Sequence, residues 1–373
     1  MRKVLVFLLA ISLFGTLFGS DKVTKEIKVN AGEKLEVDLD TGGDIEVTGW
    51  EKNLVSVIVF IEDYDKEDYD ISIEKYSKGV SVNIDSRRHH RRSGNLVAKI
   101  NVPSKFDLEL KTMGGDVKIE SVGGMIEGET MGGDLVLTKL NGKIEFSTMG
   151  GDIYLKNSEL DGEVSTMGGD VEFEDVIGDV KGSSMGGDVV YKNVKKKDGR
   201  STGKEVNIST MGGEINVDEA LFGANVSTMG GDIHIRKAGK YIKAKTMGGD
   251  IQIDKIDGSV TTSTMGGDVE VTMVGDPDQG DREVDISSLG GDLRLTVPAG
   301  LSMEFDIKLS YTRRGSEYKI ISDFPIKIEE SDDWDYSQGS KRKYIYGKGE
   351  VNGGKHRIRL DTINGNIYIL KGK

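Results

Sequence analysis

The feature that most constrains this chain is a tetrad, Met-Gly-Gly-Asp, which usually follows Thr and returns at nearly constant spacing. Successive acidic residues of the motif are separated by 18, 18, 18, 18, 26, 18, 18, 18 and 24 residues. These residues are Asp116, Asp134, Asp152, Asp170, Asp188, Glu214, Asp232, Asp250, Asp268 and, after Leu in place of Met, Asp292. A period of about 20 residues is typical of one structural unit stacked many times. A residue that every unit carries is expected to serve the unit, not to be a unique catalytic group.

One repeat, residues 134–151, contains two short stretches in which apolar residues alternate with others, as in strands with one buried face. The first stretch holds Leu135 and Leu137, the second begins at Ile144, and Asn141-Gly142 between them is a turn signal. A single unit cannot bury its apolar face, whereas stacked units would pair their strands in parallel. The repeat therefore predicts an all-β fold, a single-stranded parallel β-helix (β-solenoid) of 18-residue coils with β-rich N- and C-terminal caps.

Three further expectations follow from the repeat. Residues one and three positions after each motif acid, such as Val117 and Ile119, should face the core. The paired glycines should provide positive φ or close backbone approach. The 26- and 24-residue steps should be surface insertions, at residues 195–202 and 275–281.

The sequence divides into four segments: a signal peptide at residues 1–20, an N-terminal β cap at 21–110, the repeats at 111–297, and a C-terminal β cap at 298–373 that ends in a degenerate repeat. Arg2 and Lys3 precede an apolar run, and Gly19 and Ser20 are small residues at the expected cleavage site. We therefore expect an exported protein, periplasmic, cell-surface or extracellular. With no Cys in the chain, a lipid anchor through Cys and disulfides are both excluded.

The flanking segments carry further strand signals and imperfect copies of the motif. Alternating strands are expected at residues 34–40, 54–61, 69–74, 80–84 and 96–102. An outlying Thr-Gly-Gly-Asp ends at Asp44, and Thr-Ile-Asn-Gly-Asn-Ile-Tyr-Ile occupies residues 362–369. Atypical terminal units of this kind are typical of the caps that cover the open ends of a repeat stack.

The order of several segments resembles the bacterial DUF4097 family, β-strand-repeat proteins provisionally described as adhesins. These segments read Val-Asp-Leu-Asp-Thr-Gly-Gly-Asp-Ile-Glu-Val-Thr-Gly-Trp (37–50), Ala-Lys-Ile-Asn-Val-Pro (98–103), Leu-Thr-Val-Pro-Ala-Gly (295–300), Ile-Ser-Asp-Phe-Pro (321–325) and Ile-Arg-Leu-Asp-Thr-Ile-Asn-Gly-Asn-Ile (358–367). The resemblance implies an exported, β-helical, non-catalytic envelope protein and offers no catalytic residues to carry over.

The motif acids are the first candidate site. In register, their carboxylates would stand about 4.8 Å apart and repel by about 1 kcal/mol per pair in water-like surroundings. We expect each to accept N–H bonds from its own Gly-Gly turn or to bond a Thr hydroxyl, with no cofactor bound. The open alternative is a Ca²⁺ row. The candidate ligands would be Asp116, Asp134, Asp152, Asp170, Asp188, Asp232, Asp250 and Asp268.

The motif methionines form a second row, which we call the methionine row. It consists of Met113, Met131, Met149, Met167, Met185, Met211, Met229, Met247 and Met265. Met at a turn is most often flexible apolar filler. A soft-metal track for Cu(I) and an exposed sticky surface for a partner are the alternatives.

The third candidate is a dense basic run in a chain of net charge −13. It consists of Arg87, Arg88, His89, His90, Arg91 and Arg92 and is expected at a hairpin tip. It could contact an anionic membrane surface or glycan, or an envelope protein. An acidic, aromatic loop at residues 329–336 could instead stack Trp334 and Tyr336 on a sugar.

Composition and motifs together favour a non-catalytic, adhesin-like interaction module of the cell envelope. The net charge of −13 argues against a nucleic-acid partner, because phosphate binding needs clustered Lys and Arg. No Ser-His-Asp set, phosphate loop or metal-ligand spacing is present. The remaining alternatives are a Ca²⁺-binding solenoid and a polysaccharide-active β-helix enzyme, which would need a local cluster of carboxylates.

Overall fold

The computed structural model describes residues 21–62, 66–87, 96–194, 206–312, 318–335 and 341–372. The expected signal peptide lies outside these residues. Within them, the N-terminal part contains a 3-10 helix, η1 (Lys66–Asp68), and eight strands: β1 (Asp21–Lys28), β2 (Lys34–Leu39), β3 (Asp44–Trp50), β4 (Leu54–Ile61), β5 (Tyr69–Tyr76), β6 (Gly79–Ser86), β7 (Leu96–Pro103) and β8 (Asp107–Thr112). The five strands expected from the sequence in this part are confirmed as β2, β4, β5, β6 and β7.

The repeats and the C-terminal part supply the remaining strands. The repeats form β9 (Val117–Glu120), β10 (Gly123–Thr130), β11 (Leu135–Thr138), β12 (Asn141–Thr148), β13 (Ile153–Thr166), β14 (Val171–Ile177), β15 (Val180–Ser184), β16 (Val189–Lys192), β17 (Val206–Ser209), β18 (Ile215–Ala220), β19 (Ala224–Ser227), β20 (Ile233–Lys245), β21 (Ile251–Thr264), β22 (Val269–Met273), β23 (Val284–Ser288) and β24 (Leu293–Val297). The C-terminal part forms β25 (Met303–Thr312), β26 (Ile320–Ser322), β27 (Lys327–Glu330), β28 (Arg342–Val351), β29 (His356–Ile363) and β30 (Ile367–Lys371).

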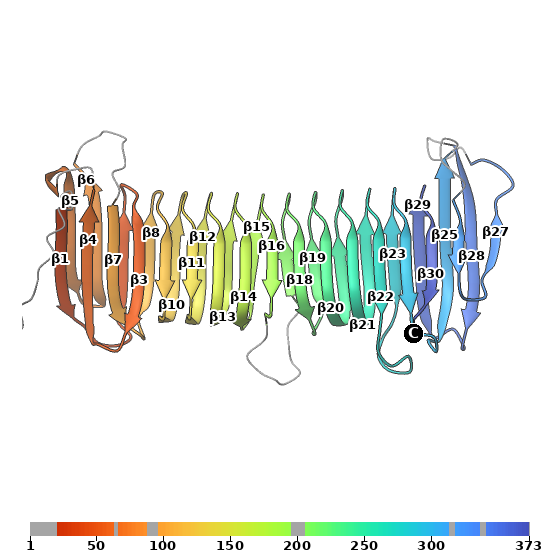
Figure 1. The fold of residues 1–373 in the computed structure, drawn as a ribbon, viewed down its shortest axis with the longest axis horizontal. Coiled ribbons are helices and arrows are strands. Elements are labelled where there is room, and N and C mark those ends of the chain that lie inside the picture. Colours follow the sequence, from red (N-terminus) through yellow and green to blue (C-terminus); the bar gives the residue numbers. More distant parts are fainter. Residues whose placement is uncertain are drawn as a thin grey trace, which may run out of the picture.

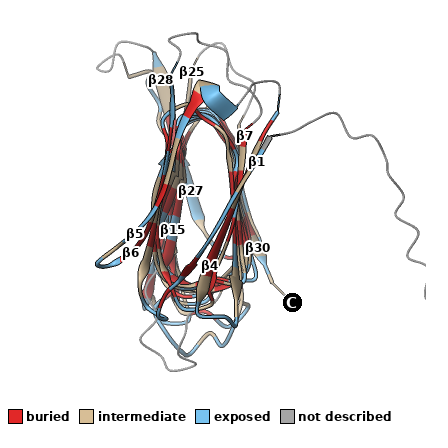
Figure 2. Cartoon of the chain, turned by 90° about the vertical axis from the view of Figure 1, so that its left-hand side faces the viewer, coloured by how far each residue is buried: buried red, intermediate tan, exposed pale blue. Residues whose placement is uncertain are grey.

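All 30 described strands belong to one hydrogen-bonded sheet, which confirms the all-β prediction. From β8 to β24 the pairing is parallel, and Asn141 to Thr148 of β12 face the residues 18 positions later in β13. Antiparallel pairs occur at both ends, for example β1 with β4 and β25 with β28, so the sheet as a whole is mixed and not wholly parallel. The strands lie side by side along an elongated molecule (Figure 1) and form two layers with buried residues between them (Figure 2).

The core is a set of columns of aliphatic side chains, one residue per coil. Val117 and Ile119 are fully buried, as their positions after the motif acid predict, and so are Ile153 and Leu155. Each column is continuous because the parallel register places like residues opposite each other, as with Ile153 and Val171. Burying a side chain of this size contributes roughly 1.5–3 kcal/mol before the entropy of ordering is subtracted.

Both imperfect copies of the motif are part of the same stack. Ile45, one residue after the outlying Asp44, pairs with Val117 although 72 residues separate them. At the other end, Ile367 of the degenerate repeat pairs with Leu293. The residues between β3 and β8 form the hairpins of the N-terminal end.

The corners of the coils follow the sequence signals only in part. Gly142 of the expected Asn-Gly turn has φ 130°, but the left-handed residue is Lys139, with φ 55°. The equivalent residues of neighbouring coils share this conformation: Ser121, Asn157, Asp175 and Asn193. Of the two proposed roles for the paired glycines, close approach holds within the repeats, because positive φ among the motif glycines occurs only in the outlying copy, at Gly42 and Gly43.

The two long steps differ in how they fit the stack. At the 24-residue step, Arg282 is 1% exposed. Its guanidinium donates to the Val274 carbonyl at 2.7 Å and to Asp257 Oδ1 at 2.6 Å, which ties the excursion down. At the 26-residue step, β15 pairs with β17 through one residue pair, Ser183 with Ser209. Residues 195–205 of this insertion lie outside the described part of the chain.

Candidate functional surfaces

The motif acids form a continuous row along one edge of the molecule, held by hydrogen bonds between coils. Asp152 Oδ1, for example, accepts the backbone N–H of Asp170 at 2.8 Å. The same bond recurs from Asp116 N to Asp44 Oδ1 (3.0 Å), Asp134 N to Asp116 (2.9 Å), Asp152 N to Asp134 (2.8 Å), Asp188 N to Asp170 (2.8 Å), Glu214 N to Asp188 (2.7 Å), Asp250 N to Asp232 (2.7 Å), Asp268 N to Asp250 (2.7 Å), Asp292 N to Asp268 (2.7 Å) and Asn366 N to Asp292 (2.6 Å). The expectation that each acid bonds its own Gly-Gly turn is therefore wrong, because the donor belongs to the next coil.

The N–H groups of each motif's own turn are taken by the preceding Thr, which is buried. Thr148 Oγ1 accepts from Gly151 N at 3.2 Å and donates to the carbonyl of Gly133 in the coil before at 2.9 Å. The second glycine has no room for a side chain, since a Cβ on Gly151 would lie 2.1 Å from the Gly133 oxygen. The tetrad is thus a structural device in which Thr, Gly and Asp each bind one coil to the next.

This arrangement offsets the repulsion within the acid row. Carboxylates about 4.8 Å apart repel by about 1 kcal/mol in water-like surroundings, and each accepted backbone N–H bond opposes that cost. Among the described residues, no group of three or more His, Asp or Glu side chains could hold a metal ion. The row is therefore an anionic edge whose first oxygens are already bonded within the protein.

The methionine row lies beside the acid row, at the opposite edge from the 26-residue insertion. Its nine side chains are 41–54% exposed, from Met211 and Met247 at the lower limit to Met113 at the upper. Leu289, in the coil that has Leu in place of Met, is 54% exposed. Exposure of this size argues against the interpretation of these residues as core filler.

The basic run falls almost entirely outside the described residues. Arg88, His89, His90, Arg91 and Arg92 lie there, so the run stays a prediction. Arg87, the described member, ends β6's hairpin side, with its N–H bonded to the Asp68 carbonyl at 2.9 Å. Its guanidinium lies 3.5 Å from Asp70 Oδ1.

The acidic, aromatic loop is packed against the C-terminal end. Trp334 makes an edge contact with Tyr311, with 5.8 Å between the ring centroids. The Tyr311 hydroxyl and the Lys343 ammonium both donate to Glu330, and these bonds lower the pKa of that carboxyl. Tyr336 lies outside the described residues. The expected pair of stacking rings is therefore seen only as Trp334, which already contacts a ring of the protein.

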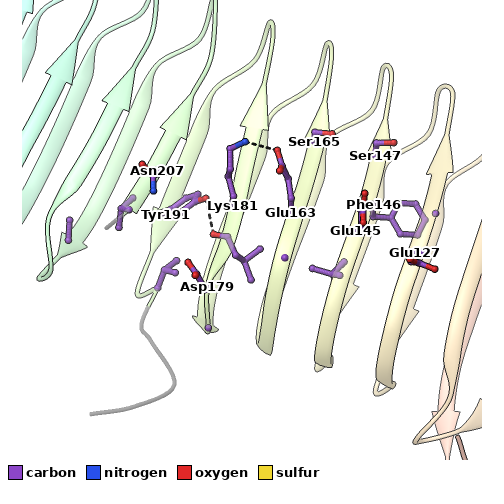
Figure 3. A pocket seen from close by; sticks show the side chains of 18 of the residues that line it. Glu127, Glu145, Phe146, Ser147, Glu163, Ser165, Asp179, Lys181, Tyr191 and Asn207 are labelled. Carbon is purple, nitrogen blue, oxygen red and sulfur yellow. Dashed lines mark hydrogen bonds and ion pairs between the residues drawn. The ribbon is translucent and has the colours of Figure 1, made fainter. Parts of the chain in front are cut away.

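The structure adds a groove that the sequence did not predict. It encloses about 1290 Å³ across the outer face of β8, β10, β12, β13, β15 and β17. Glu127, Glu145 and Glu163 line it on successive strands, and the Lys181 ammonium lies 2.7 Å from Glu163 Oε1 (Figure 3). Seven carboxylates and two lysines line the groove, which suits the amino or guanidinium groups of a ligand better than an anion.

The groove ends where β15 and β17 part, and Tyr191 closes that end from inside. The Tyr191 hydroxyl accepts the Gly182 N–H at 2.6 Å and lies 3.4 Å from the Val180 carbonyl, in place of bonds from a neighbouring strand. Figure 3 shows the ring reaching this strand edge. Burial raises the pKa of Tyr191, which keeps its hydroxyl protonated. The available signal was a Tyr in an inward column at the step where the period lengthens.

Taken together, these features define a class: an all-β repeat protein whose coils are joined by a recurring turn motif. The comparison with protein families agrees. The family model described as Toastrack DUF4097 matches residues 161–333, which confirms the resemblance to that family. Within the described residues there is no helix of the length and apolarity that a membrane crossing requires.

Several solved structures are similar at low identity. One, from Parabacteroides merdae, is provisionally described as an adhesin; the match has 15% identity, covers 68% of this chain and 96% of that chain, and has a TM-score of 0.36. A second adhesin, also provisionally described, from Parabacteroides distasonis has 13% identity, covers 74% and 97%, and has a TM-score of 0.32. A cell adhesion protein, likewise provisional, from Clostridium sporogenes has 13% identity, covers 95% and 100%, and has a TM-score of 0.21. No curated protein matches the chain.

Proposed function

We propose that this protein is an exported, non-catalytic β-solenoid that acts as an adhesin-like, rod-shaped interaction module of the cell envelope. Residues 111–297 would form the 18-residue coils, and the segments at 21–110 and 298–373 would cap them. The partner would be an envelope protein, a glycan or an anionic membrane surface. The signal-like segment at residues 1–20 supports export.

One observation carries the proposal: the same bonds recur in coil after coil. Thr148 to Gly133, Thr166 to Gly151 and Thr246 to Gly231 are equivalent bonds of 2.9, 2.8 and 2.9 Å. A polysaccharide-active enzyme built on such a stack needs coils that depart from the repeat around a reacting bond. The interruption among the described coils, at β15 and β17, is closed by a Tyr hydroxyl. A repeated, rigid frame is what a spacer or interaction surface requires.

The basic run is the contact that we propose with an anionic envelope surface. Arg87, Arg88, Arg91 and Arg92 concentrate positive charge on a chain of net charge −13. Such a contact is electrostatic, so it should weaken steeply between low and physiological salt.

The test is co-sedimentation of the full chain with vesicles of phosphatidylglycerol or of phosphatidylcholine. Replacing the four Arg by Ser should abolish sedimentation with the anionic vesicles and leave the β content unchanged. A matched control replaces four exposed lysines from elsewhere on the molecule by Ser, and it should sediment nearly as well as wild type. These lysines are Lys105, Lys118, Lys143 and Lys245. Equal loss in both variants would show that only net charge matters, and wild type that stays in solution at low salt would remove the basic run as the contact.

A further inference from the structure

Sulfur is concentrated on one edge of this molecule. Each of the nine side chains of the methionine row is at least 41% exposed, whereas Met273 and Met303 are 2% and 0% exposed. The row carries one thioether per coil across nine consecutive coils, and the chain has no Cys.

The fold itself does not require Met at these positions. The coil with Leu289 keeps the standard bonds, since Ser288 Oγ donates to the Gly267 carbonyl at 2.9 Å and Asp292 N donates to Asp268 Oδ1 at 2.7 Å. The last coil has Ile363 at this position, and Thr362 Oγ1 still donates to the Gly291 carbonyl at 2.7 Å. A branched aliphatic side chain therefore serves the turn equally well.

Packing does not explain the repeated Met either, because the side chains lie in solvent and add apolar surface there. The property that Leu and Ile lack is the chemistry of the thioether. We propose that the methionine row is a site of sulfur oxidation that consumes two-electron oxidants of the peroxide and hypohalous acid class.

The reaction needs only the side chain and the oxidant. The thioether sulfur attacks the terminal oxygen of hydrogen peroxide, the O–O bond breaks, and the oxygen remains on sulfur as a sulfoxide while water leaves. Sulfur loses two electrons and the peroxide gains them. With hypochlorous acid the leaving species is chloride, with release of a proton.

The structure accommodates a sulfoxide at each position of the row. Hydrogen bonds along this edge use the methionine backbone, as from Met211 N to the Met185 carbonyl at 3.2 Å. A new oxygen on sulfur would point into solvent and disturb none of them. At Met273 or Met303 the same oxygen would have to be buried among apolar side chains, which is costly.

The experiment treats the folded chain with increasing hydrogen peroxide and maps oxidation at each Met by peptide mass spectrometry. We expect the nine positions of the row to gain one oxygen each, Met273 and Met303 to stay unmodified, and the melting temperature to remain within error. The matched variant replaces all nine by Leu, as Leu289 already does in its own coil. It should fold alike and take up about nine fewer oxygen atoms per chain.

A competition measurement tests the proposed sink. A short reporter peptide with one Met is mixed with either protein and oxidised with a limiting amount of hypochlorous acid. Wild type should protect the reporter several-fold better than the nine-Leu variant. Equal protection, oxidation of Met273 and Met303 at the rate of the row, or unfolding on oxidation would each overturn the proposal.

Discussion

The coils around β12 and β13 and the step between β15 and β17 belong to the same stack but differ in how they are joined. β12 pairs with β13 over eight residues, from Asn141 to Thr148, whereas β15 meets β17 only at Ser183 and Ser209. The edge of the molecule continues without a break at this step. Thr210 Oγ1 donates to the Gly187 carbonyl at 3.0 Å, as in the regular coils.

The comparison indicates that the turn motif, more than the full length of both strands, keeps the coils in register. On the other layer, Val189 of β16 still pairs with Ile215 of β18. On the opened layer, Tyr191 replaces the missing strand contact. A stack can therefore carry a long insertion on one layer when the Thr, Gly and Asp bonds are intact.

The largest expected effect is a charge placed in the core of a regular coil. Ile153→Asp should destabilise the protein by about 4 kcal/mol or more, because the carboxylate would stand in a column of buried aliphatic side chains. Val206→Asp, at the opened step, should cost only about 1 kcal/mol, because Val206 is partly exposed and lines the groove. Urea unfolding measures both, and equal losses would contradict the difference between the two regions.

The next effect separates the two glycines of one motif. Gly151→Ala should destabilise by about 3 kcal/mol or more, since the new Cβ would lie 2.1 Å from the Gly133 oxygen. Gly150→Ala is the matched control, because its Cβ would be 3.6 Å from the Gly132 oxygen. It should be neutral or stabilising by up to about 1 kcal/mol. Similar losses at both positions would show that the motif binds the coils in some other way.

The third effect concerns the closure of the opened step. Tyr191→Phe removes the acceptor of the Gly182 N–H and should cost roughly 1–3 kcal/mol, with faster amide exchange confined to β15. Tyr154→Phe, which removes an exposed hydroxyl bonded to Asp152, should cost less than about 0.5 kcal/mol. If Tyr191→Phe left exchange in β15 unchanged, the closing role of this hydroxyl would be wrong.

The smallest expected effect tests the acid row. If its carboxylates serve the coils through backbone N–H bonds, excess EDTA should leave the melting temperature within error, because stabilisation by mass action requires an ion bound to the native state. Calorimetric scans with EDTA, Ca²⁺ and Mg²⁺ measure this. A fall of several degrees in EDTA that Ca²⁺ restores and Mg²⁺ does not would favour the Ca²⁺ alternative.

Much of the fold was predictable because its information is local and repeated. The alternation around Val117 and Ile119 specifies which residues face the core, and one repeat applies to all the others. The donor to each motif acid was not predictable in this way, since a single repeat does not show which neighbouring coil supplies the N–H. The contact of Asp44 with Asp116 also depends on the path of the hairpins between them.

The candidate surfaces were less predictable because they arise where the repeat is interrupted. Tyr191 stands in the same column as Phe173 and Val217, and only the position of the step distinguishes its role. Arg282 was expected in or near a surface insertion, yet it is buried because three backbone carbonyls and Asp257 accept its hydrogen bonds. The groove combines side chains from at least six strands, and no segment of the sequence contains its pattern.

The most direct test of the account is a set of distances along the methionine row. Because the chain has no Cys, Met113→Cys can be combined with Cys at one further row position at a time and spin-labelled. The account predicts that the distance measured by pulsed dipolar spectroscopy grows by about 4.8 Å per coil. The same increment should hold from Met185 to Met211, although 26 residues separate them. A clear jump at that step, or distances that do not grow linearly with coil number, would contradict the stacking of coils in register.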